Sequence, residues 1–93
     1  MIIGACSIEL HIFEVHSLKE KRHVIKSILG RLQSRFNISV AEVDKFDVWQ
    51  SSVIGIACVS NEATHVRSMI SSVMNFVDAD GRVEITNHEI EIL

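Results

Sequence analysis

The stretch from Ile2 to Phe36, IIGACSIELHIFEVHSLKEKRHVIKSILGRLQSRF, changes its hydrophobic period part-way along its length. Within residues 2–13, apolar and polar side chains mostly alternate, which predicts a half-buried β-strand. From Ser17 the motif Ser-Leu-Lys-Glu has the spacing of a capping box, and the apolar residues after it recur three and four positions apart. The sequence therefore predicts a helix that begins after Ser17 and runs to about Phe36.

The rest of the chain predicts three further strands and a second helix. Residues 38–43 are short and β-branched, and residues 53–59 are apolar on both parities, as is typical of a central strand. Apolar side chains with helical spacing follow from Val66 to Val77. Residues 83–93 predict the last strand, and a change of apolar parity indicates either a β-bulge near Asn87 or a change in which face of the strand is covered.

The predicted order of elements is βαββαβ, which places the chain in the α+β class. Two βαβ units with right-handed crossovers put both helices on one face of a four-stranded antiparallel sheet, the ferredoxin-like arrangement. We expect residues 1–93 to form a single domain, because the chain is short and 47% hydrophobic. The other face stays open, and since residues 53–59 are apolar on both sides, we expect a second copy to cover it in a homodimer.

The predicted first helix is basic, although the chain has a net charge of −3. Phosphate contacts through Lys and Arg supply most sequence-independent affinity for nucleic acids, and aromatic residues for stacking on unpaired bases are scarce. This pattern favours structured RNA or a ribosomal subunit as the partner, while an amphipathic helix with solvated charges would explain it equally. Six of the nine basic residues lie on this helix, whose only acid is Glu20: Lys19, Lys21, Arg22, Lys26, Arg31 and Arg35.

No motif predicts catalysis, a cofactor or a metal site. The five histidines and two cysteines lack the spacing of metal ligands, and the four glycines are too scattered for a phosphate loop. Cys6 and Cys58 lie in apolar runs and predict core packing. We therefore expect a protein that is not an enzyme. No apolar run is long enough to span a membrane and no secretory signal follows Met1, so we expect a cytoplasmic protein.

Trp49 and Gln50 are the candidates for contact with a protein partner. A lone Trp in the turn before the third strand either covers the core or anchors a partner. The alternative to RNA binding is therefore a regulatory dimer that binds a protein or a small molecule through the open sheet face.

Several segments together resemble the YlxP-like family of small bacterial proteins, also called DUF503. They are HSLKEKR at residues 16–22, Arg31-Leu32, RFNISVAEV at residues 35–43, Trp49-Gln50 and the segment 55–61. The resemblance implies a ferredoxin-like βαββαβ fold. It also implies a bacterial cytoplasmic protein whose gene commonly lies among genes for transcription antitermination, translation initiation and ribosome maturation. The family offers no established catalytic residues to transfer to this chain.

Overall fold

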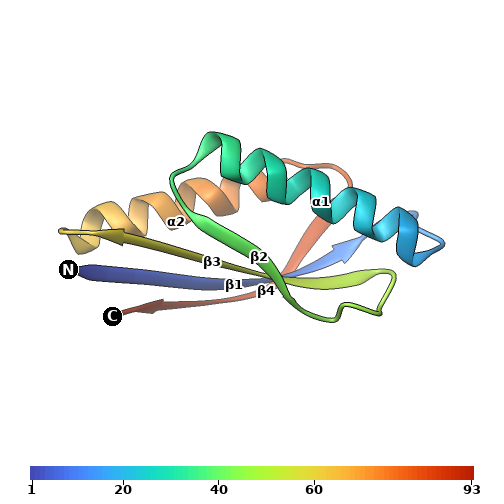
Figure 1. Ribbon diagram of the computed structural model, residues 1–93, viewed down its shortest axis with the longest axis horizontal. Coiled ribbons are helices and arrows are strands. Elements are labelled where there is room, and N and C mark those ends of the chain that lie inside the picture. The colour runs from blue at the N-terminus through green and yellow to red at the C-terminus, as the bar shows by residue number, and fades with distance from the viewer.

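The computed structural model describes residues 1–93 and contains four strands and two helices (Figure 1). The sheet is antiparallel throughout, in the order β2-β3-β1-β4, and both helices lie on one side of it. This arrangement confirms the predicted ferredoxin-like α+β fold. In chain order the elements are β1 (Ile2–Ile12), α1 (Leu18–Arg35), β2 (Ser39–Asp44), β3 (Ser51–Ser60), α2 (Ala63–Asp78) and β4 (Val83–Ile92).

The core lies between the sheet and the two helices and contains 17 buried apolar residues. β1 supplies the alternate side chains Ile8, Leu10 and Ile12, which are fully buried, while its other parity faces away from the helices. Each such side chain contributes roughly 1.5 to 3 kcal/mol when it leaves water. The helices supply two matching stripes: Ile25, Ile28 and Leu32 from α1, and Val66, Ile70, Val73 and Val77 from α2.

The helix α2 packs closely on β1 because of Gly4. A Cβ atom at this position would overlap Cγ1 of Val66 and would lie 3.2 Å from Cδ1 of Ile70. Gly4 is thus the point at which the absence of a side chain sets the distance between helix and sheet.

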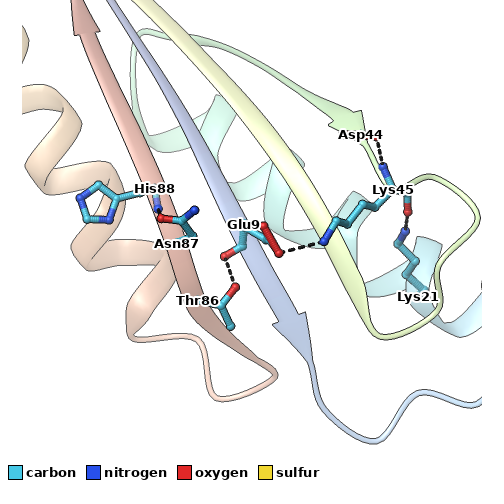
Figure 2. Close-up of polar contacts among 7 residues, drawn as sticks. All are labelled: Glu9, Lys21, Asp44, Lys45, Thr86, Asn87 and His88. Atoms are coloured by element: carbon cyan, nitrogen blue, oxygen red, sulfur yellow. Dashed lines mark hydrogen bonds and ion pairs between the residues drawn. The ribbon is translucent and has the colours of Figure 1, made fainter.

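The predicted bulge in the last strand is present, one residue from the expected position. Asn87 pairs with Glu9 and Ile85 pairs with Leu10, so Thr86 is the extra residue of β4. Its hydroxyl donates to the carbonyl oxygen of Glu9 at 3.3 Å (Figure 2). The extra residue keeps apolar side chains on the helix-covered face on both sides of the bulge, which explains the change of parity in the sequence.

The start of α1 follows the predicted capping box with one difference. The Ser17 hydroxyl accepts a hydrogen bond from the Glu20 amide at 3.1 Å. The Glu20 carboxylate accepts a hydrogen bond from the amide of His16, one residue before the cap. In the standard capping box the donor would be the amide of Ser17. Both contacts hold the first turn of α1, which carries part of the basic surface described below.

Candidate nucleic-acid interface

The position of α1 on the sheet turns five of its six cations to solvent. Because the helix buries a single stripe of side chains, residues on its opposite side and flanks remain exposed. The three ion pairs in the structure involve other residues, so none of these five cations is paired with a carboxylate. The five are Lys19, Arg22, Lys26, Arg31 and Arg35, and together they form what we call the basic face of α1.

Three of these cations border a shallow groove on the outer side of α1. Small residues of α1 form the centre of this groove. The space above Gly30 is open, because a Cβ atom added there would have no neighbour within 4 Å. No carboxylate lines the groove, so its chemistry suits an anion. The groove has a volume of about 530 Å³ and is lined by Lys26, Ser27, Gly30, Arg31, Ser34, Arg35 and Phe76.

One end of the groove is held by aromatic contacts. The guanidinium carbon of Arg35 lies 5.2 Å from the centre of the Phe76 ring, and Phe36 meets Phe76 edge-to-face with ring centres 5.8 Å apart. A cation over an aromatic face is attracted by the ring, and a cation at a helix C-terminus is also favoured by the helix dipole. These contacts hold the side chain of Arg35, the last residue of α1, against Phe76 of α2.

The other end of the groove is held by an ion pair that the sequence did not predict. Arg82 donates from Nε and Nη2 to Asp80 at 2.9 and 2.7 Å, and Nη2 also donates to the Ser27 hydroxyl at 3.3 Å. The hydrogen bond from Arg82 holds the pKa of Asp80 below its ordinary value, and the charges of Arg82 and Arg31 lower it further. The turn before β4 is thereby tied to the middle of α1.

Lys21 does not lie on the basic face, which corrects the expectation that it contacts nucleic acid. Its side chain is fully buried. The ammonium group donates to the carbonyl oxygens of Lys45 and Phe46 and forms an ion pair with Glu42 at 3.1 Å. The two carbonyl oxygens accept hydrogen bonds, and the Glu42 carboxylate balances the charge of the ammonium group. Lys21 is thus a structural residue that ties α1 to the loop between β2 and β3.

The Glu42 carboxylate completes this buried cluster. Its Oε2 atom also accepts a hydrogen bond from the hydroxyl of Ser52 at 2.6 Å, and Ser52 is fully buried on β3. Every buried side-chain nitrogen and oxygen in the structure has a hydrogen-bond partner. A satisfied cluster of this kind rigidifies its surroundings, whereas loss of one member leaves a buried charge without compensation.

Trp49 and Gln50 lie in the loop that Lys21 holds. Trp49 is 50% exposed, so it does not cover the core, and Phe46 and Val48 beside it are exposed to a similar extent. The backbone oxygen of Gln50 accepts a hydrogen bond from Ile12 at 2.9 Å, which extends the pairing of β1 and β3 by one residue. Contact with a protein partner remains the prediction for Trp49 and Gln50.

The remaining candidate groups lie apart from one another. No three His, Cys, Asp or Glu side chains come together in an arrangement that could hold a metal ion. Cys6 and Cys58 are free and buried, and burial raises the pKa of the Cys6 thiol. Neither helix combines the length and the apolar composition needed to cross a membrane.

Comparison with known proteins identifies relatives along almost the whole chain. A family model described as "Protein of unknown function (DUF503)" matches residues 3–90. The chain is also 39% identical over 85 residues to the uncharacterized protein YlxP of Bacillus subtilis (strain 168), which covers 91% of this chain and 92% of that protein. The basic face, the groove and the buried Lys21 all lie within the matched region.

We expect Lys21→Met to lower the free energy of unfolding by about 3 kcal/mol, because it leaves the Glu42 carboxylate partly buried without its counter-charge. Arg22→Met removes a cation from the neighbouring, exposed position and should change stability by less than about 0.5 kcal/mol. Urea denaturation measures both. Trp49 is the only tryptophan, so its fluorescence anisotropy in the native state should fall in Lys21→Met alone. Equal losses in the two variants would contradict the assigned role of Lys21.

We expect the stability difference between wild type and Asp80→Asn to depend on pH. The pKa of Asp80 is lowered in the folded protein, so its pairing with Arg82 stabilises the fold above the ordinary pKa of 3.8. This contribution is lost as the pH falls through the lower, folded-state pKa. The difference should be at most about 1 kcal/mol at pH 7, because Arg82 is partly exposed, and should shrink below pH 3.8. A difference that stays constant down to pH 2 would contradict this assignment.

Proposed function

The chain belongs to the DUF503 family, whose function is unknown, and we propose that it binds structured RNA through the basic face of α1. It would be a non-enzymatic protein, and ribosomal RNA in particular would be its partner. The observation that carries the proposal is the set of five exposed cations without ion-pair partners on one helix. They flank a groove that contains no carboxylate. Unpaired cations on a rigid helix can contact phosphates without first breaking an internal ion pair.

The kind of nucleic acid follows from the shortage of aromatic side chains on this surface. Phe76 is the only aromatic residue that lines the groove, and its ring is in contact with Arg35 and Phe36. The surface therefore offers no free ring on which unpaired bases could stack. Backbone phosphates of a folded RNA are the better match, since they are recognised through charge and shape.

The acidic balance of the rest of the chain predicts how this binding responds to salt. With a net charge of −3, the protein gains little from long-range attraction to RNA, so affinity depends on the direct contacts of the basic face. Each phosphate contact releases counterions and steepens the fall of affinity with salt. Co-sedimentation with bacterial ribosomal subunits and with free structured RNA should thus decrease sharply between about 50 and 200 mM salt.

Binding to a protein partner through the loop is the second candidate function. The exposed Phe46, Val48 and Trp49, held in place by Lys21, support it, because aromatic residues on a rigid support are common anchors of protein contacts. Trp49→Ala separates the two candidates within the same co-sedimentation experiment. It leaves the cations of α1 in place, so binding that depends on the basic face should be retained.

The two substitutions Gly30→Glu and Gly30→Gln test the proposal with a matched pair. Both side chains have the same size, the site has free space around it, and both residues favour a helix more than Gly does. Gly30→Glu adds a carboxylate to the groove and should weaken RNA binding. In a titration of RNA at several salt concentrations, it should also reduce the salt slope, which is the slope of log affinity against log salt concentration, by roughly 0.7 to 0.9, the equivalent of one phosphate contact.

In the same titrations, Gly30→Gln should bind RNA with the wild-type salt slope. Circular dichroism would confirm that both variants are folded. If the two variants bound equally well, the groove would not be the RNA site. If neither they nor the wild type sedimented with ribosomal subunits or RNA at either salt concentration, the proposed function would be wrong.

A further inference from the structure

One face of the sheet is left uncovered, since both helices lie on the other (Figure 1). The alternate side chains of the central strands β1 and β3 face this side, and many of them are apolar. Val59 is 62% exposed, and Phe13 and Val43 are exposed by about half at the opposite end of the strands. Apolar patches of this kind mark interaction surfaces in most proteins.

The pairing register arranges the middle of this face in two rows. In one row Ala41, Gly55, Ser7 and Glu89 lie side by side on β2, β3, β1 and β4. The neighbouring row contains Ser39, Ala57, Ala5 and Glu91 in the same order. Each row thus has three small residues and then a glutamate, and the two rows line a hollow of about 770 Å³.

The unpaired charges of this face are unevenly distributed. Lys45 reaches across β3 and pairs with Glu9 at 2.9 Å, which neutralises the carboxylate of the central strand (Figure 2). Glu89 and Glu91 on β4 form no ion pair, whereas β2 presents Ser39, Ala41 and Val43 to this face and carries a carboxylate on this side only at its end, where Asp44 pairs with Val53. Opposite the two glutamates the face is therefore neutral along β2, and it is negative along β4.

We propose that the open sheet face binds a second copy of this chain, in a dimer whose two-fold axis runs parallel to the strands. Extents of 43 Å along the strands and 17 Å across them give this face an area of about 730 Å² (Figure 1), which lies within the roughly 600 to 1,000 Å² that each partner contributes to a standard interface. A self-complementary interface of this type closes the dimer, because each copy uses the same face.

The charge pattern selects the direction of the axis. A two-fold axis parallel to the strands places β4 of one copy over β2 of the other, so the long side chains of Glu89 and Glu91 cover Ala41 and Ser39 of the partner. Their carboxylates then lie at the rim, where water solvates them. An axis perpendicular to the strands stacks β4 on β4 and brings like charges together, which is unfavourable.

Sedimentation velocity at low micromolar concentration tests the dimer, and two glutamate substitutions test its location. Ala57 is exposed at the centre of the face, so Ala57→Glu should leave the chain folded and convert the dimer to a monomer. Ser72→Glu adds the same charge to the exposed side of α2 and should remain dimeric. A monomeric wild type, or the same behaviour of both variants, would overturn the proposal.

A cross-linking experiment tests the axis and does not depend on the fate of Ala57→Glu. In the proposed dimer Glu89 of one copy lies over Ala41 of the other, so a short bis-maleimide can join cysteines at these two positions. Within one chain the same positions lie three strand spacings apart, about 14 Å, which is too far for such a reagent. A mixture of Ala41→Cys and Glu89→Cys should give cross-linked dimers, and Glu89→Cys alone should not.

The native thiols do not obscure this result, because Cys6 and Cys58 are buried and the wild type serves as the control. Cross-linking of Glu89→Cys alone, to the same extent as in the mixture, would show that the axis runs perpendicular to the strands and would overturn the proposed arrangement. Absence of cross-links in every combination would overturn the proposed interface.

Discussion

The burial of one stripe of α1 against the sheet determines where each charge on this helix lies. Ile25, Ile28 and Leu32 are removed from water, and this holds the helix in a single rotation about its axis. Lys21 lies on the same stripe, four residues before Ile25, and is carried into the interior. The other five cations are turned outward together. The basic face and the buried cluster thus follow from the same packing.

The buried lysine links this packing to the far side of the molecule. Lys21 holds the loop after β2 through two carbonyl oxygens, and the side chain of Lys45 in that loop extends to Glu9 on the open face (Figure 2). Lys45 has a positive φ of 58°, a conformation that few residues adopt without support from their surroundings. The helix that carries the basic face therefore also fixes the loop that borders the open face.

Most of the fold could be predicted from the sequence, because the spacing of apolar residues along the chain distinguishes strands from helices without knowledge of distant contacts. The six elements and the bulge near Asn87 follow from alternation and helical spacing, and the capping serine follows from the Ser-Leu-Lys-Glu motif. The site was harder to predict. The spacing of Lys21 to Ile25 places it on the buried stripe, whereas its charge favours exposure, and the two signals conflict in the sequence. The contact of Arg82 with Ser27 joins residues far apart in the chain, and only the tertiary fold brings them together.

The claim that the basic face of α1 binds RNA is tested most directly by amide chemical shifts of the labelled protein during titration with a structured ribosomal RNA fragment. Binding through this face should shift amide signals between Lys19 and Arg35 on the exposed side of α1, and these shifts should diminish as salt is added. Amides along β1 and β3 should not shift. Shifts confined to the open sheet face or to the loop around Trp49, or no shifts at low salt, would contradict the claim.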